Sequence, residues 1–147
     1  MIYLDKPIDF DNVTVVVGCF VECAGEVLFL HRLDSKPEGN TWCSPGGKLD
    51  PEDKGNCSTA IARELKQETG IDVKKEAFIF IATFYVIYPN GKKFIYHKYL
   101  LLLETKPDVV LNLQEHKAFV WKLPEKAMEE LELILHEGDT IQHVYYL

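Results

Sequence analysis

PGGKLDPEDKGNCSTAIARELKQETGI, residues 45–71, is the most informative stretch of this chain. Its two adjacent glycines, Gly46 and Gly47, have no β-carbon, so the backbone there can approach a ligand or a helix closely. Residues 58–69 are rich in helix formers, begin at a serine that can cap a helix and are followed at once by Gly70. The stretch therefore predicts a glycine turn, a loop and a helix over residues 58–69.

Two carboxylates share one face of this expected helix. At 100° per residue, Glu64 and Glu68 lie one turn apart with about 40° between them, and Gln67 lies about 60° to the other side of Glu64. Ile61 and Leu65 fall about 60° and 100° from Glu64, so the acids border the apolar stripe that packs into the core. Partly buried like charges raise each other's pKa unless a cation neutralises them. A hard divalent metal with oxygen ligands is therefore the natural partner of this face.

Composition limits the class of protein. The 147 residues are 47% apolar and 27% charged, which is typical of a soluble globular chain, and we expect one domain over residues 1–147. With 16 Lys and Arg against 23 Asp and Glu, the net charge is −7, which argues against binding along a nucleic acid. A protein of this charge can still bind phosphates if divalent cations lie between its carboxylates and the substrate.

The same sequence gives expectations about location and assembly. The start of the chain lacks a signal-peptide pattern and no apolar run reaches ~18 residues, so we expect a cytoplasmic protein that does not enter the membrane. The four cysteines show no metal-binding spacing and are expected to be buried or idle thiols. The sequence does not determine the oligomeric state, and a homodimer is left open.

The other elements follow from β-branched and aromatic runs separated by turn residues. We expect strands over residues 13–21, 26–31, 77–88, 94–104 and 118–123, with hairpin turns at 23–25 and 89–91. Pro124 suits the first turn of a second helix, which is expected to run to about His136 with Gly138 behind it. Strands on both sides of one central helix predict an α/β (α+β) fold, with a mixed β-sheet sandwiched between helices.

Nine consecutive residues, Arg63 to Ile71, resemble the second half of the signature of the Nudix (MutT-like) hydrolase family, G-x(5)-E-x(7)-R-E-U-x-E-E-x-G-U with U aliphatic. Every fixed position matches except the first acid of the Glu-Glu pair, which is Gln67. In the first half, the loop acid is Asp53 instead of Glu, and nine residues rather than seven separate it from Arg63. A two-residue insertion around residues 53–56 explains the difference. The resemblance extends to most of the chain.

The resemblance implies a Nudix fold and hydrolysis of a nucleoside diphosphate linked to another group, at the pyrophosphate, with Mg²⁺ or Mn²⁺ and a water nucleophile. By position, it implies that Arg63 orients a neighbouring glutamate and that either Glu64 or Glu115 is the general base. The implied metal ligands are Glu64, Gln67, Glu68, Glu115 and the backbone carbonyl of Gly47. The candidate substrate-binding residues are Arg32, Lys48 and Trp42, of which Trp42 lies in an expected loop and offers an aromatic face to a base.

Several alternatives stay open at this point. The first choice of substrate is a nucleoside or deoxynucleoside triphosphate, followed by nucleotide sugars and dinucleoside polyphosphates. A protein of another class, a Nudix-fold module that binds a nucleotide or a protein without turnover, is suggested by Gln67 and the altered loop. Acids on the helix can also form an ordinary solvated face with local ion pairs, and Arg32 and Glu115 can be plain surface charges.

Overall fold

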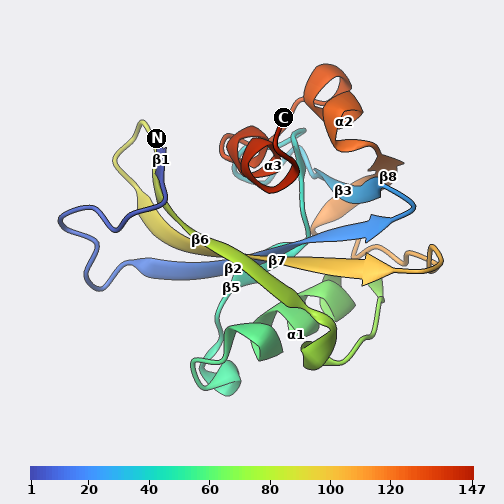
Figure 1. Ribbon diagram of the computed structural model, residues 1–147, viewed down its shortest axis with the longest axis horizontal. Coiled ribbons are helices and arrows are strands. Elements are labelled where there is room, and N and C mark those ends of the chain that lie inside the picture. The colour runs from blue at the N-terminus through green and yellow to red at the C-terminus, as the bar shows by residue number, and fades with distance from the viewer.

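The computed structural model describes all 147 residues and has one mixed sheet with helices on both faces (Figure 1). Along the main path the strands follow the order β1-β6-β7-β2-β3-β4, while β5 pairs with β2 and β8 with β3. The strands are β1 (Ile2–Tyr3), β2 (Thr14–Cys23), β3 (Glu26–Arg32), β4 (Trp42–Cys43), β5 (Gly46–Lys48), β6 (Ile79–Ile87), β7 (Lys93–Leu103) and β8 (His116–Lys122). The helices are α1 (Cys57–Thr69), α2 (Pro124–Glu130) and α3 (Glu137–Tyr145), with short 3-10 turns at Pro51–Asp53 and Lys75–Ala77.

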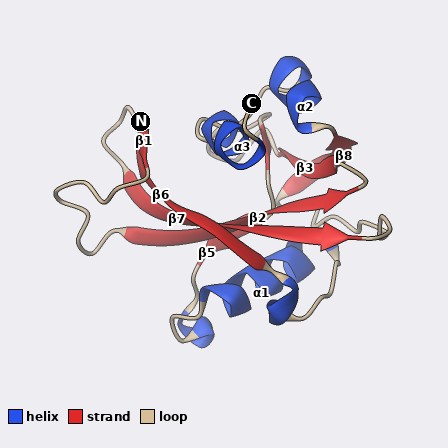
Figure 2. Cartoon of the chain, in the orientation of Figure 1, coloured by secondary structure: helices blue, strands red, loops and turns tan.

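The layers explain why β2 is apolar along nearly all of its length. Helix α1 covers one face of the sheet, whereas α2 and α3 cover the other (Figures 1 and 2). On β2, Val17 and Cys19 belong to the core cluster that contains Ile61 and Leu65 of α1. Phe20 points to the opposite face and packs in a second cluster with residues of α2 and α3. Because both faces are covered, successive side chains of the strand are buried.

The long pairing of β2 with β7 joins the two halves of the sheet. These strands run parallel in continuous register from Thr14 opposite Phe94 to Cys23 opposite Leu103. β7 also pairs antiparallel with β6 across the expected hairpin, where Gly91 has a φ of 86° that a left-handed turn requires. The mixed α+β architecture expected from the sequence is confirmed, and none of the helices has the length and apolar character needed to cross a membrane.

Three local expectations about the helices were wrong. The residue that caps α1 is Asn56, whose side-chain oxygen accepts a hydrogen bond of 2.9 Å from the backbone N–H of Thr59, so the helix begins before Ser58. The expected helix over residues 124–136 ends at Glu130. Beyond it, the chain hydrogen-bonds to Trp42 of β4, which donates to the Glu132 carbonyl and accepts from the backbone N–H of Ile134. These contacts with the sheet hold the segment in an extended form.

A separate helix, α3, follows this extended segment. Gly138 lies inside its first turn instead of ending a helix, contrary to the sequence expectation. A β-carbon at Gly138 would lie 3.4 Å from the terminal methyl carbon of Met128, which is an ordinary van der Waals contact, so α3 packs against α2 at this position.

Candidate active site

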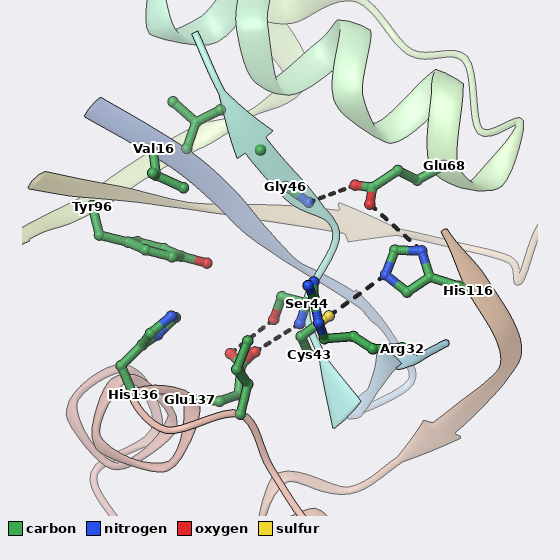
Figure 3. Close-up of a pocket in the computed structure, with 13 residues that line it drawn as sticks. Val16, Arg32, Cys43, Ser44, Gly46, Glu68, Tyr96, His116, His136 and Glu137 are labelled. Carbon is green, nitrogen blue, oxygen red and sulfur yellow. Dashed lines mark hydrogen bonds and ion pairs between the residues drawn. The ribbon is translucent and has the colours of Figure 1, made fainter. Parts of the chain in front are cut away.

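Glu68 is the most buried acid of the α1 face. Its exposed fraction is 8%, and its Oε1 accepts a 2.7 Å hydrogen bond from the backbone N–H of Gly46 (Figure 3). Burial raises the pKa of this carboxyl well above its ordinary value; the Gly46 N–H opposes the shift, and the nearby charges of Glu64 and Glu115 add to it. The fold therefore holds Glu68 where a cation would stabilise its charged form.

The second acid, Glu64, lies directly against the glycine turn. A β-carbon on Gly47 would lie 2.6 Å from the Glu64 carboxyl carbon, which is shorter than any normal contact. Burial raises the pKa of Glu64, although Arg63 opposes the shift by donating a 2.9 Å hydrogen bond from Nη1 to Oε1. Only a glycine at position 47 leaves room for the Glu64 carboxylate in its present place. The position of this acid on the helix therefore depends on the paired glycines of the turn.

Arg63 connects the helix to the inserted loop. Its Nε and Nη2 donate to the two carboxylate oxygens of Asp53 at 3.2 and 2.9 Å, and Asp53 is buried. The hydrogen bonds from Arg63 lower the pKa of Asp53 despite its burial, so the pair is charged at neutral pH. Nη1 also donates to Gln67 Oε1 at 3.2 Å. The longer loop thus still brings its acid to Arg63, which in turn holds Glu64 and Gln67.

These groups surround one open space, here called the acidic hollow, with a volume of about 550 Å³. Seven of the residues predicted from sequence line it: Arg32, Gly47, Lys48, Glu64, Gln67, Glu68 and Glu115. Arg63 lies behind the wall and donates hydrogen bonds to three of them, Lys48, Glu64 and Gln67. Glu115 forms an ion pair of 3.5 Å with Lys36, on the loop that follows β3. Residues that are far apart in the sequence are therefore brought to one space.

Trp42 is the exception. It lies in β4 rather than in a loop, stacks on His31 with 4.2 Å between ring centres, and packs against the core cluster under α2 and α3. It lines none of the spaces described here. Its aromatic ring is used to hold β4 to the C-terminal segment, and the expectation that it binds substrate finds no support in the structure.

A smaller space of about 140 Å³, the inner hollow, opens behind the glycine turn and shares Arg32, Gly46, Gly47 and Glu68 with the acidic hollow. Figure 3 shows Tyr96, His136 and His116 around it. The Nδ1 atoms of His116 and His136 are buried and have no hydrogen-bond partner. Burial lowers the pKa of both rings, that of His116 to about 4, so both are neutral at pH 7.

A buried ion pair supports this inner wall. Lys98 of β7 and Glu137 of α3 are 0% and 1% exposed, with 3.1 Å between Lys98 Nζ and Glu137 Oε1. The backbone N–H and the hydroxyl of Ser44 also donate to the Glu137 carboxylate, at 2.6 and 2.9 Å (Figure 3). Because Ser44 lies two residues before Gly46, this network ties α3 to the turn that holds Glu68.

These inner residues have only weak signals in the sequence. Lys98 is a charge within the apolar run over residues 93–103, and a charge in a buried strand needs a partner. Its partner, Glu137, lies 39 residues away at the start of a helix that was not expected. His136, which lines the inner hollow, lies just before that helix and has no motif around it.

The donor set of the acidic hollow suits a hard divalent cation. Its candidate ligands are carboxylate, amide and backbone carbonyl oxygens, which Mg²⁺ and Mn²⁺ favour. No three acidic or histidine side chains converge on one point in this structure. Glu64 is instead held by Arg63 and Glu68 by Gly46, so a bound ion would have to draw these carboxylates together.

The sheet, the glycine turn and the acid-bearing helix together define a Nudix protein. The chain belongs to this family, because the family model described as NUDIX domain matches residues 12–143. The family acts on nucleoside diphosphate-linked substrates.

Among curated proteins, the chain is similar to the CTP pyrophosphohydrolase of Escherichia coli (strain K12), with 28% identity over 116 residues and 78% of each chain covered. Among solved structures, it resembles a C. elegans Ap4A hydrolase in a binary complex, with a TM-score of 0.71, 25% identity and coverage of 91% of this chain and 96% of that one. The NUDIX domain of Shewanella oneidensis NrtR, complexed with ADP ribose, has a TM-score of 0.78, 15% identity and coverage of 97% and 92%. The nucleotides that these names give differ from one protein to the next: CTP, Ap4A and ADP ribose.

Proposed function

We propose that this protein is a divalent-metal-dependent pyrophosphohydrolase that acts on nucleoside or deoxynucleoside triphosphates. The observation that carries the proposal is the pairing of two partly desolvated carboxylates, Glu64 and Glu68, with a glycine turn at the wall of one hollow. Arg32 and Lys48 line the same space and provide positive charge for phosphate oxygens. Acids for a metal and cations for phosphates therefore lie around one substrate-sized volume.

The proposed metal is Mg²⁺ or Mn²⁺. The residues that would hold it are Glu64, Gln67, Glu68, Glu115 and the backbone carbonyl of Gly47. The raised pKa values of Glu64 and Glu68 mean that both carboxylates gain from a nearby cation. When bound, such an ion polarises a phosphate and lowers the pKa of a coordinated water.

The remaining steps belong to the side chains. Glu64 or Glu115 accepts the proton of the attacking water, and Arg63 holds Glu64 in place through its 2.9 Å hydrogen bond. Arg32 and Lys48 pair with the phosphate oxygens as negative charge shifts toward the leaving group. The guanidinium of Arg63 forms an ion pair with Asp53, so Arg63 is a residue that positions Glu64.

We place the nucleobase in the inner hollow. The space adjoins the glycine turn, and it offers an aromatic face on Tyr96 together with the unpaired Nδ1 of His136. A neutral polar ring suits such a wall better than a phosphate does, because Glu137 lies beside it. A nucleoside triphosphate is favoured over nucleotide sugars and dinucleoside polyphosphates because the curated relative is named for one, CTP.

A nucleotide panel tests the proposal. The purified chain is incubated with ribo- and deoxyribonucleoside triphosphates, nucleotide sugars and dinucleoside polyphosphates with Mg²⁺, and the products are separated by ion-exchange chromatography. We expect a nucleoside monophosphate and pyrophosphate from at least one triphosphate. Glu68→Gln is expected to lower the rate about a thousand-fold, the equivalent of about 4 kcal/mol of transition-state stabilisation. A Glu68→Gln protein as active as the parent would refute the assignment.

The second candidate is a module that binds a nucleotide without cleaving it. Gln67 favours this function because it stands where the signature has an acid, and an amide is a weaker ligand for a further ion. Binding of a nucleotide by calorimetry, with no product from any member of the panel, would support the module. The retained Arg63, Glu64 and Glu68 favour the enzyme, because a binder does not need a group of acids that activates a metal-bound water.

A further inference from the structure

A third space, the outer hollow, continues from the acidic hollow toward the β6–β7 hairpin. Its volume is about 540 Å³, and the two spaces share Arg32, Gly47 and Lys48. Lys92 and Lys93, just after the hairpin turn, also line it. A substrate held at the acidic hollow can therefore extend past Arg32 and Lys48 to this hairpin.

The outer hollow is cationic in an otherwise acidic protein. Four of its side chains, Arg32, Lys48, Lys92 and Lys93, carry positive charge, and none of them forms an ion pair with a carboxylate. Its only acid is Glu38. In a chain with a net charge of −7, four cations without acidic partners around one space are a marked local excess.

The hydrogen bonds of these residues show which charges are free for a ligand. The Glu38 carboxylate is already engaged, because its two oxygens accept from the Tyr88 hydroxyl at 2.9 Å and from the backbone N–H of Leu135 at 3.1 Å. Lys93 donates to the Asp9 carbonyl, so part of its role is structural. The ammonium groups of Lys48 and Lys92 make no hydrogen bond within the protein, and Lys92 is exposed.

We propose that the outer hollow binds a terminal phosphate of the substrate, on the side of the cleaved bond away from the nucleoside. The inference rests on the proposed function and deepens it. It places the base in the inner hollow, the reacting phosphates in the acidic hollow and the end of the polyphosphate beside Lys92. The substrate class that fits is a nucleotide whose leaving part ends in a second phosphate, such as a triphosphate, rather than a nucleotide sugar, whose leaving sugar phosphate ends in an uncharged sugar.

The first test is equilibrium binding of inorganic tripolyphosphate, measured by calorimetry in EDTA so that turnover plays no part. Lys92→Glu is compared with Lys74→Glu, an exposed lysine next to the 3-10 turn at Lys75–Ala77 that gives the same change in net charge. We expect Lys92→Glu to weaken binding about tenfold, because two charge units change beside a multiply charged anion under partial screening. Equal affinity in the Lys92→Glu and parent proteins, or equal weakening by Lys74→Glu, would overturn the site.

The second test separates a terminal phosphate from any other part of a substrate. With a triphosphate, Lys92→Gln is expected to raise KM several-fold relative to Lys74→Gln. The inhibition constant of a nucleotide sugar, measured in competition with the same triphosphate, is expected to be the same in both variants. Equal weakening of the triphosphate and the nucleotide sugar by Lys92→Gln would overturn the assignment to a terminal phosphate. A protein that binds tripolyphosphate through Lys92 but cleaves no nucleotide would leave the anion site standing and remove the proposed enzyme.

Discussion

Replacing Lys98 by methionine should lower the stability of the fold by about 3 to 4 kcal/mol at pH 7. Methionine keeps most of the side-chain volume, so the main effect is to leave Glu137 as a buried carboxylate without its cation, a loss that is typically about 3–5 kcal/mol. Ser44 still donates two hydrogen bonds to that carboxylate, which moderates the cost. The variant also loses the position of Nζ over the Phe20 ring, 3.8 Å from its centre. Urea unfolding followed by tryptophan fluorescence measures the change.

The loss of stability in Lys98→Met should depend on pH, in a direction set by the pKa of Glu137. Burial opposes ionisation of Glu137, yet the charge of Lys98 holds its pKa below the ordinary value. The stabilisation is therefore present above the unfolded-state pKa of about 4.3 and is lost as the pH falls through the folded-state pKa. Without Lys98 the carboxyl pKa rises, so the stability deficit should shrink as the pH is lowered from 7 toward 5. The double variant Lys98→Met with Glu137→Gln should recover at least half of the loss. A deficit below 1 kcal/mol, or a double variant no more stable than the single one, would refute the reasoning.

Three further changes probe other parts of the account. Gly47→Ala should lower kcat about a hundred-fold with little loss of stability, because the new β-carbon displaces the Glu64 carboxylate; an unchanged kcat would contradict the geometry. Gln67→Glu should preserve or raise the hydrolysis rate and lower the Mg²⁺ concentration at half-maximal rate, whereas a higher Mg²⁺ requirement would count against a ligand at this position. Asn56→Ala should cost about 1 kcal/mol in thermal unfolding through loss of the cap on Thr59, and no loss would place the cap elsewhere.

The parts of the fold that the sequence predicted have strong local signals. Helix α1 has an apolar stripe and Gly70 at its end with a φ of 75°, and the β6–β7 hairpin has Asn-Gly at its turn. Two of the predicted acids, Glu64 and Glu68, also lie on one helix, where angular spacing fixes their relation before any tertiary contact is known. These features agree with the structure because short-range geometry determines them.

The remaining features depend on contacts between distant segments. The segment around Leu133 has a helical composition, but its hydrogen bonds to β4 keep it extended, and no local pattern indicates that pairing. Trp42 is an aromatic residue in an expected loop, which favours stacking on a base. In the structure it lies in β4 and packs against the core cluster under α2 and α3. The inner hollow is made by Tyr96, His136 and Ser44, which come together only when the parallel pairing of β2 with β7 and the docking of α3 are in place.

Binding of Mn²⁺ to the nucleotide-free protein shows whether the acid face of α1 and the glycine turn hold a divalent ion. Calorimetric titration at pH 7 compares the parent chain with Glu68→Gln and with Glu129→Gln, an exposed acid on α2. We predict that the parent and Glu129→Gln bind Mn²⁺ alike and that Glu68→Gln binds at least tenfold more weakly, a loss of about 1.4 kcal/mol or more. Equal affinity in all three proteins, or no binding in the parent, would contradict the account.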